Sequence, residues 1–442
     1  MITRSPLVQY LSLNAIYFGA SFMWNTLHPI VLPLLLLNYG SEGTKNTRLG
    51  MLTFAGYALA MFIQPLSGAL SDQTRHRWGK RRPWIVYGGG VAIGALLLLA
   101  LSGSFWMLAA GYLLLQVAMN AVMGPSHGLI PDSVREGHRG LAVGLRSLLD
   151  MLGIIAAAFF AGLLADRVGA DAPVGLLMAA VMLGGGTLLT VRATRRLQGS
   201  ADAAPRSRRQ SSREVFDVGR MRKMLDVDMN EHPGYLRLLI SRFWLLLATS
   251  LVLSFGFYYF QDALQLDNPA GAVSNLMTSI GIPMGLVVLP AAILSERWGR
   301  KGLSLGACAM MAICISLLSL ARTMPAIRIL GLIAGVGMGT FVSVNWAWAT
   351  DLAPLDQAGK YLGLANLATA GTSALGRLMG PVIDLANAWR ANIGYTLVFV
   401  LAGASILTAL YYTLRIPETR GRYSVSDPLA IPLDPSLGGD HL

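Results

Sequence analysis

Two oppositely charged side chains lie four residues apart inside a long apolar run. The run extends from Leu141 to Leu164 and contains Arg146 and Asp150. If the run is a helix, this spacing places both side chains on one face, where they can pair. If it crosses a membrane, each charge near the centre costs about 2.5–3.5 kcal/mol, and such groups mostly face a cavity and serve function. Asp150 could therefore carry a proton or bind a sodium ion, with Arg146 as its counter-charge; the alternative is a static ion pair that joins helices.

Amide and aromatic side chains recur in four other apolar runs. They are Trp24, Asn25 and His28 in the first run, Gln116 and Asn120 in the fourth, Asn345 and Trp346 in the tenth, and Asn366, Thr369 and Arg377 in the eleventh. A sugar stacks its CH faces on aromatic rings and bonds its hydroxyls to amides. We therefore predict that members of this set line a sugar-binding cavity, although each alone could be a helix-packing contact. Arg377 could instead select an anionic solute.

The apolar runs that carry these side chains dominate the composition. The chain has 442 residues, of which 54% are apolar and only 13% charged, and its mean hydropathy is +0.54. Average soluble domains carry about 25% charged residues, and a run of about 20 apolar residues spans a bilayer core. We expect twelve spans: Tyr10–Leu37, Leu49–Leu70, Trp84–Leu101, Phe105–Ile130, Leu141–Leu164, Pro173–Val191, Leu236–Phe260, Ala272–Leu294, Leu303–Leu320, Ile327–Thr350, Tyr361–Leu385 and Ile393–Leu414.

These spans predict an all-α integral membrane protein, because backbone groups in hydrocarbon need partners within their own segment. Weak period-2 alternation argues against a barrel. The net charge of +12 could suggest nucleic acid, but the basic residues cluster in loops between spans, as membrane topology requires. The sequence has no Gly-Lys-Ser/Thr phosphate loop, no catalytic constellation and no paired metal spacing among its histidines and two cysteines. We therefore expect neither an enzyme nor a bound cofactor or metal.

One basic loop and one acidic motif each occur twice along the chain. "LSDQTRHRWGKR" after the second span is matched by "LSERWGRK" after the eighth, and "PDSVREGHRGLAVGL" after the fourth by "TDLAPLDQAGKYLGL" after the tenth. The repeat predicts two pseudo-twofold-related six-helix bundles with a central cavity between them. The expected divisions are a first bundle at 1–192, a basic cytoplasmic linker at 193–235, a second bundle at 236–416 and a disordered tail at 417–442.

The loop after the second span resembles that of a known family. Gly68-x-x-x-Asp72 followed by Arg77-x-Gly79-Lys80-Arg81-Arg82 is similar to the signature loop of the major facilitator superfamily. "QTRH", "RRPW", "GPSHGLIPD" and "FGASFMW" resemble the glycoside–cation symporter branch that includes the sucrose transporters, and "PETRGR" resembles the end of the last helix in sugar porters. The resemblance implies a secondary transporter that works by alternating access.

The signature loop suggests a latch at the cytoplasmic face. A carboxylate at the end of the second span can bond a helix N-terminus, and the resemblance implies that the partner is the eleventh span. We expect Asp72 and Arg77 to form the latch while the cytoplasmic side is closed, with Glu296 and Arg297 as its second copy. The full expected gate is Gly68, Asp72, Arg77, Gly79, Arg81, Asp132, Glu296, Arg297 and Asp351. The alternative is that the basic residues only anchor the topology.

The resemblance leaves the coupling site open. Sucrose-type symporters carry an acidic residue that aligns with Gln116, which cannot titrate, so coupling has moved to Asp150 or has been lost in a uniporter. Phe255–Asp262, "FGFYYFQD", is either an external aromatic gate or an interfacial belt.

We predict a transporter of a sugar or glycoside with a coupled H⁺ or Na⁺. The alternatives are an exporter of amphipathic compounds and a transporter-like scaffold or sensor that moves nothing. Lys and Arg predominate in the loops on one side, which predicts cytoplasmic N- and C-termini in a bacterial inner membrane. The expected partners are a small solute, the coupling cation and the lipid bilayer, with no nucleic acid, and the expected state is a monomer.

Overall fold

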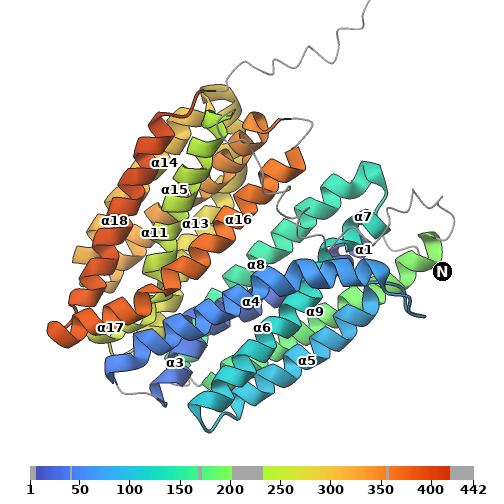
Figure 1. Ribbon diagram of the computed structural model, residues 1–442, viewed down its shortest axis with the longest axis horizontal. Helices are drawn as coiled ribbons and strands as arrows, with labels where there is room; N and C mark the ends of the chain where they lie inside the picture. Colours follow the sequence, from blue (N-terminus) through green and yellow to red (C-terminus); the bar gives the residue numbers. More distant parts are fainter. Residues whose placement is uncertain (1–5, 40–41, 168–171, 202–231, 355–357, 419–442) are drawn as a thin grey trace, which may run out of the picture.

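A computed structural model describes residues 6–39, 42–167, 172–201, 232–354 and 358–418. Helices account for nearly all of them, in two groups that follow each other along the chain (Figure 1). The first half consists of α1 (Pro6–Leu13), α2 (Ala15–Thr26), the π-helical segment η1 (Leu27–Val31), α3 (Leu32–Leu37), the 3₁₀ turn η2 (Glu42–Thr44), α4 (Lys45–Gln73), α5 (Arg82–Ala100), α6 (Phe105–His127), α7 (Leu129–Ser133), the 3₁₀ turn η3 (Glu136–His138), α8 (Arg139–Arg167) and α9 (Ala172–Ala201).

The second half has the same order of long helices. It consists of α11 (Pro233–Ser254), α12 (Gly256–Tyr258), the π-helical segment η5 (Tyr259–Ala263), α13 (Pro269–Trp298), α14 (Arg300–Leu320), α15 (Met324–Leu352), α16 (Ala358–Arg377), α17 (Met379–Trp389) and α18 (Ile393–Leu414). Helix α9 continues to Ala201, so its last turns enter the segment predicted as linker. The rest of that linker, 202–231, and the tail, 419–442, lie outside the described residues.

The predicted fold class is confirmed. Eleven helices are long and apolar enough to cross a membrane within the described residues. The predicted eleventh span, Tyr361–Leu385, is formed by α16 and α17 together, which are separated at Leu378. Pro381 explains the break, because its ring clashes with the carbonyl four residues earlier, that of Arg377, and it has no N–H to donate.

Two spans contain a short π-helical segment. In the first span, η1 lies between α2 and α3 and contains His28 and Pro29. In the seventh, η5 carries Asp262. Such segments re-aim side chains and occur often at functional sites. Both segments present polar side chains to the interface between the halves, as described below.

The predicted repeat is visible in matching contacts of the two halves. Arg81 Nε donates to Asp132 at 3.0 Å, and Arg300 Nε donates to Asp351 at 3.1 Å. The two arginines also donate to Ser71 and Ser295, respectively. Gly79, two residues before Arg81, and Gly299, directly before Arg300, have positive φ angles of +88° and +97°, which an L-residue with a Cβ rarely adopts. The halves therefore form the two pseudo-twofold-related bundles that the repeat predicts.

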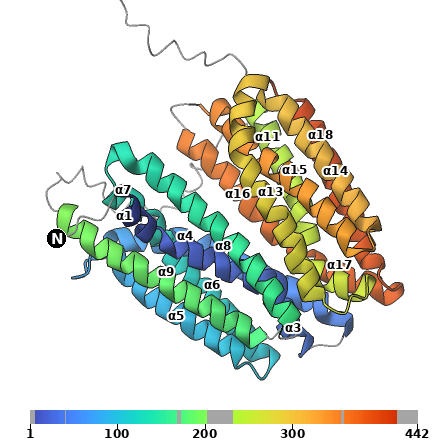
Figure 2. The ribbon, with the colours of Figure 1, turned by 180° about the vertical axis from the view of Figure 1, so that it is seen from behind.

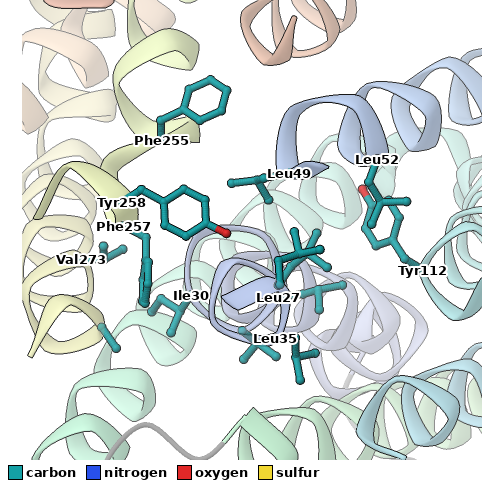
Figure 3. Close-up of a cluster of buried hydrophobic side chains, with 14 of the residues drawn as sticks. Leu27, Ile30, Leu35, Leu49, Leu52, Tyr112, Phe255, Phe257, Tyr258 and Val273 are labelled. Carbon is teal, nitrogen blue, oxygen red and sulfur yellow. The ribbon is translucent and has the colours of Figure 1, made fainter. Parts of the chain in front are cut away.

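The two halves meet at one end and diverge at the other (Figures 1 and 2). We call the end that carries η2 (Glu42–Thr44) and residues 390–392 the closed end, and the end that carries the loop 74–81 the basic end. At the closed end, apolar side chains of both halves form one cluster, in which Phe257 and Tyr258 lie beside Leu27 and Ile30 (Figure 3). Tyr258 also donates a hydrogen bond across the interface to the carbonyl of Pro33 at 3.0 Å.

Two glycines let α4 touch the end of α16 and the start of α17 through their backbones at the closed end. A Cβ added to Gly50 would collide with the carbonyl of Arg377, and one added to Gly380 would collide with that of Asn46. We therefore expect Gly380→Val to destabilise this conformation by roughly 1–3 kcal/mol, the usual cost of overpacking. Thermal unfolding of the purified protein measures the loss. Gly371→Val is the control, because a Cβ there meets nothing within 4 Å; equal effects of both variants would contradict the assignment.

Candidate functional site

A cavity of about 340 Å³ lies between the two halves. Its wall comes from η1 and helices α2, α4, α11, α13, α15 and α16. The volume falls within the range of roughly 300–1,000 Å³ that holds small molecules. The lining combines aromatic rings, hydroxyls and a single charged side chain: Trp24, Asn25, His28, Pro29, Leu49, Thr53, Tyr57, Leu246, Thr249, Ser250, Leu253, Ser254, Phe255, Met277, Met338, Thr369, Thr372, Ser373 and Arg377.

An aromatic ladder runs along one side of this cavity. The rings of Trp24 and His28 stack with centroids 4.9 Å apart and planes 7° apart, and the His28 ring lies 5.6 Å from that of Tyr57. The guanidinium of Arg377 covers the other end, 4.3 Å from the Tyr57 centroid. The ladder therefore joins the first, second and eleventh spans into one surface that ends in a cation.

Five of the ten predicted cavity residues line the cavity: Trp24, Asn25, His28, Thr369 and Arg377. Gln116 and Asn120 instead lie buried in α6 behind the wall. Gln116 donates to the Tyr112 hydroxyl at 2.7 Å, and that hydroxyl bonds His28 Nε2 at 2.9 Å. Asn120 donates to the Gln116 carbonyl at 2.8 Å. These two amides hold His28 in place through Tyr112 and do not contribute to the lining.

Asn345 and Trp346 gather around an arginine that sequence analysis did not single out. Arg242, in α11, is buried and donates to Asn345 Oδ1 at 2.9 Å and to Thr369 Oγ1 at 3.1 Å. Its guanidinium lies 5.1 Å from the Trp346 ring. The signal was available, because Arg242 is an isolated charge in an apolar run, as Arg146 is. Asn366 is exposed, on the same face of α16 as Thr369 but nearer the basic end.

Arg146 and Asp150 occupy the predicted common face of α8 but do not pair with each other. Asp150 accepts a hydrogen bond from Ser21 of α2, and the Arg146 guanidinium lies 4.2 Å from the ring of Tyr17. At 100° per residue, Asp150 points about opposite to Leu148 and Leu152, which are exposed apolar side chains. The two charges thus contact the neighbouring helix α2, with Asp150 still exposed, and the apolar side of α8 lies opposite.

At the basic end, the predicted gate residues make contacts within their own halves. Asp72 pairs with Arg81 at 2.5 Å and with Lys80 at 4.0 Å, whereas the Arg77 guanidinium lies 5.5 Å from the Trp78 ring. Gly68 faces the backbone of Gly124 in α6, not the eleventh span. In the second half, the matching ion pair is made by Arg300, while Glu296 and Arg297 are exposed. Residues 355–357, before α16, lie outside the described residues, so the latch stays a prediction for the state in which the basic end is closed.

The latch predicts a specific phenotype for Asp72→Asn. In the predicted latch, the Asp72 carboxylate bonds the N-terminus of the eleventh span, and it does so only when the basic end is closed. Asparagine has no charge for this contact, so the variant should favour the conformation open at the basic end. We expect a several-fold slower transport cycle and faster labelling of a cavity cysteine from the basic side. Asp267→Asn, an exposed acid at the closed end, provides the control. An unchanged cycle and unchanged labelling would refute the latch.

At the closed end, a polar network joins the halves and was missed by sequence analysis. Lys45 pairs with Asp262 at 2.5 Å, and Asp262 also accepts from the Tyr395 hydroxyl at 2.6 Å. The buried Asp384 accepts from the backbone N–H of Thr47 at 2.6 Å and from the Asn46 amide at 2.9 Å. Asp384 therefore caps the N-terminus of α4, where the helix dipole favours a negative charge. Phe255–Asp262, the predicted gate or belt, supplies Asp262 and the buried Tyr258 to this contact.

Among the described residues, no cluster of three or more His, Cys, Asp or Glu side chains is arranged to hold a metal ion. The cavity instead has the features of a site for an organic solute, and its position between two repeated bundles is that of a transport pathway. A sequence profile described as "MFS/sugar transport protein" matches residues 13–384.

The chain belongs to this family of major facilitator sugar transport proteins. Over 397 residues it is 25% identical to an uncharacterized protein of Mycobacterium bovis, covering 86% of this chain and 87% of the relative. A stretch of 158 residues is 28% identical to the human proton-associated sugar transporter A, covering 32% of this chain and 20% of the human protein.

Solved structures share the fold of this major facilitator protein. The chain is 14% identical to a nucleoside transporter of known structure. The two structures align over 92% of this chain and 98% of the transporter, with a TM-score of 0.68. The chain is 17% identical to a D-xylose–proton symporter of known structure. The alignment covers 94% of this chain and 98% of the symporter, with a TM-score of 0.66. The protein is thus a multi-pass membrane protein of a transporter family, and its family and structural neighbours are transporters rather than enzymes.

Proposed function

We propose that this protein is a secondary transporter that carries a sugar or related hydroxylated solute by alternating access, driven by a coupled cation. The observation that carries the proposal is the cavity between the halves, with its ladder of Trp24, His28 and Tyr57. Aromatic faces suit the CH faces of a sugar ring. The hydroxyls of Ser373 in α16 and Ser254 in α11, on facing helices, suit its hydroxyls.

The coupling cation is assigned to Asp150. Its carboxylate lies outside the cavity lining, on a helix face turned toward α2. Acids at such depth are retained in transporters mainly for ion or proton movement. The names of two similar proteins, a proton-associated sugar transporter and a D-xylose–proton symporter, support a proton as the cation.

The structure supports a conformation that is closed to the outside and open to the cytoplasm. From the basic loops at the open end we infer, by the positive-inside rule, that this end faces the cytoplasm, together with the start of α1 and the end of α18. We assign the protein to the cytoplasmic membrane of a bacterium, where it acts as a monomer.

Uptake by proteoliposomes tests the function. We expect radiolabelled sugar to accumulate above its external concentration when an inward proton gradient is imposed, and to exchange by counterflow without a gradient. Counterflow without accumulation would identify a uniporter. No movement of any sugar, together with no ligand-induced rise in thermal stability, would overturn the proposal and favour a non-transporting sensor; movement of amphipathic compounds only would identify an exporter.

A further inference from the structure

Arg377 carries a positive charge into the cavity that the protein does not neutralise. Its guanidinium donates to the Ser373 carbonyl at 2.7 Å and to the Tyr57 hydroxyl at 3.3 Å. A guanidinium has five N–H donors, so these two hydrogen bonds leave other N–H groups of Arg377 available to a solute. Arg377 forms no ion pair within the described part of the chain, although it lines a cavity in the middle of the bundles.

The surroundings of the cavity add to this positive charge. Its lining contains no carboxylate, as the residues named above show. Arg242 lies directly behind Thr369. Within the described residues, its hydrogen-bond partners, Thr369 and Asn345, are both uncharged. At 1.5 Å per residue, Thr369, the residue that Arg242 contacts, lies about 12 Å from Arg377 along α16. Nearby acids are otherwise occupied: Asp384 and Asp262 bind groups of the closed end.

Arg377 is partly buried, and a charge without a partner is costly inside a membrane protein. Such charges are retained when they meet an opposite charge during function. Resting on the function proposed above, we propose that the transported solute is a hydroxylated ring compound that carries one carboxylate, which Arg377 binds. A planar guanidinium bonds a carboxylate bidentately. The Tyr57 ring beneath the guanidinium fixes its orientation, and the stacked Trp24 and His28 rings offer the adjoining surface for the solute ring.

Hydroxyl groups of the wall fit the remainder of such a solute. Ser254 of α11 lines the cavity, whereas the Oγ of Ser250 is buried against Gly376 and has no hydrogen-bond partner among the described residues. Ser373 and Thr372 lie on the turn of α16 before Arg377. A ring bound by its carboxylate at Arg377 would therefore find hydroxyl donors and acceptors on both α11 and α16.

Matched pairs of sugars test this proposal, because each pair differs only in a CH₂OH or COO⁻ group. Binding of glucose and glucuronate, and of galactose and galacturonate, is measured by calorimetry and thermal stabilisation of the purified full chain. We expect at least one uronate to bind ten- to a hundredfold more tightly than its neutral partner. Arg377→Gln should bring that ratio to about one, with the affinity for the neutral sugar changed only a few-fold.

Two further variants separate binding from a structural role of Arg377. Arg377→Lys keeps the charge without the fork, and should retain part of the uronate preference. Tyr57→Phe removes the hydroxyl acceptor but leaves the guanidinium, and should keep the preference. If Arg377 only tied α16 to α4, Tyr57→Phe and Arg377→Gln would lower stability alike and leave the ratio unchanged, which would overturn the proposal.

Transport of the neutral sugars distinguishes failure of this proposal from failure of the proposed function. If a neutral sugar is transported and bound as tightly as its uronate, or more tightly, the carboxylate assignment is wrong and the transporter assignment stands. If no sugar of either kind is bound or moved, both are wrong.

Discussion

Asp150→Asn should abolish uphill accumulation of the solute while leaving exchange across the membrane intact. An amide cannot take up or release a proton, so the cation gradient is no longer coupled to solute movement. The accumulation ratio in proteoliposomes should fall to about one, whereas counterflow should continue within a few-fold of the unmodified rate. The two assays together separate a coupling role from a general loss of folding.

Controls for this prediction follow from the contacts of α8. Asp150→Glu keeps a titratable group and should retain part of the accumulation. Ser21→Ala removes the hydroxyl that donates to Asp150 and should lower accumulation less than Asp150→Asn does, because the carboxyl group remains. Imposing proton and sodium gradients separately identifies the ion. An Asp150→Asn protein that still concentrates its solute would show that Asp150 is a structural residue.

Asp384→Asn should open the closed end. The carboxylate accepts from Thr47 N and Asn46 Nδ2 across the interface, and a bond to a charged group contributes about 1.5–3 kcal/mol. Asparagine loses the charge that the α4 dipole favours and keeps one acceptor oxygen. The ratio of conformations should therefore shift by roughly 10- to 100-fold toward the one open at this end.

Cysteine labelling measures this shift. Ser254→Cys places a reporter in the cavity lining, in a background where the buried Cys308 and Cys314 are replaced by alanine. A membrane-impermeant maleimide added at the closed end should label the reporter faster in Asp384→Asn. Asp267→Asn, an exposed acid at the same end, should leave the rate unchanged. Equal rates in both variants would show that Asp384 does not hold the halves together.

The closed end gives a physical counterpart to the predicted latch. Asp384, at the end of the eleventh span, caps the start of the second span. The latch predicted from the sequence has the reverse arrangement, in which Asp72 at the end of the second span caps the start of the eleventh. Because the two contacts lie at opposite ends of the same helix pair, they cannot form together while the halves rock about the cavity. Each would stabilise one of the two conformations.

The sequence alone determined the class of protein, the number of spans and their twofold repetition. These follow from local properties: run length against bilayer thickness, the chemistry of the backbone in hydrocarbon, and motifs that recur at a fixed offset. It also singled out Arg146 and Asp150, since an isolated ionic group in an apolar run is visible without coordinates, although the same signal at Arg242 was missed.

Only the tertiary structure decided which polar groups share a site. Gln116 and Asn120 have the composition of cavity residues, yet the rotation of α6 buries them behind Tyr112. Arg146 and Asp150 have the spacing of a pair, yet α2 supplies Tyr17 and Ser21 as nearer partners. Tyr57 and Arg377 lie 320 residues apart in the chain. Helical periodicity fixes which residues share a face of one helix, but the face that meets a neighbour depends on the packing of all the helices together.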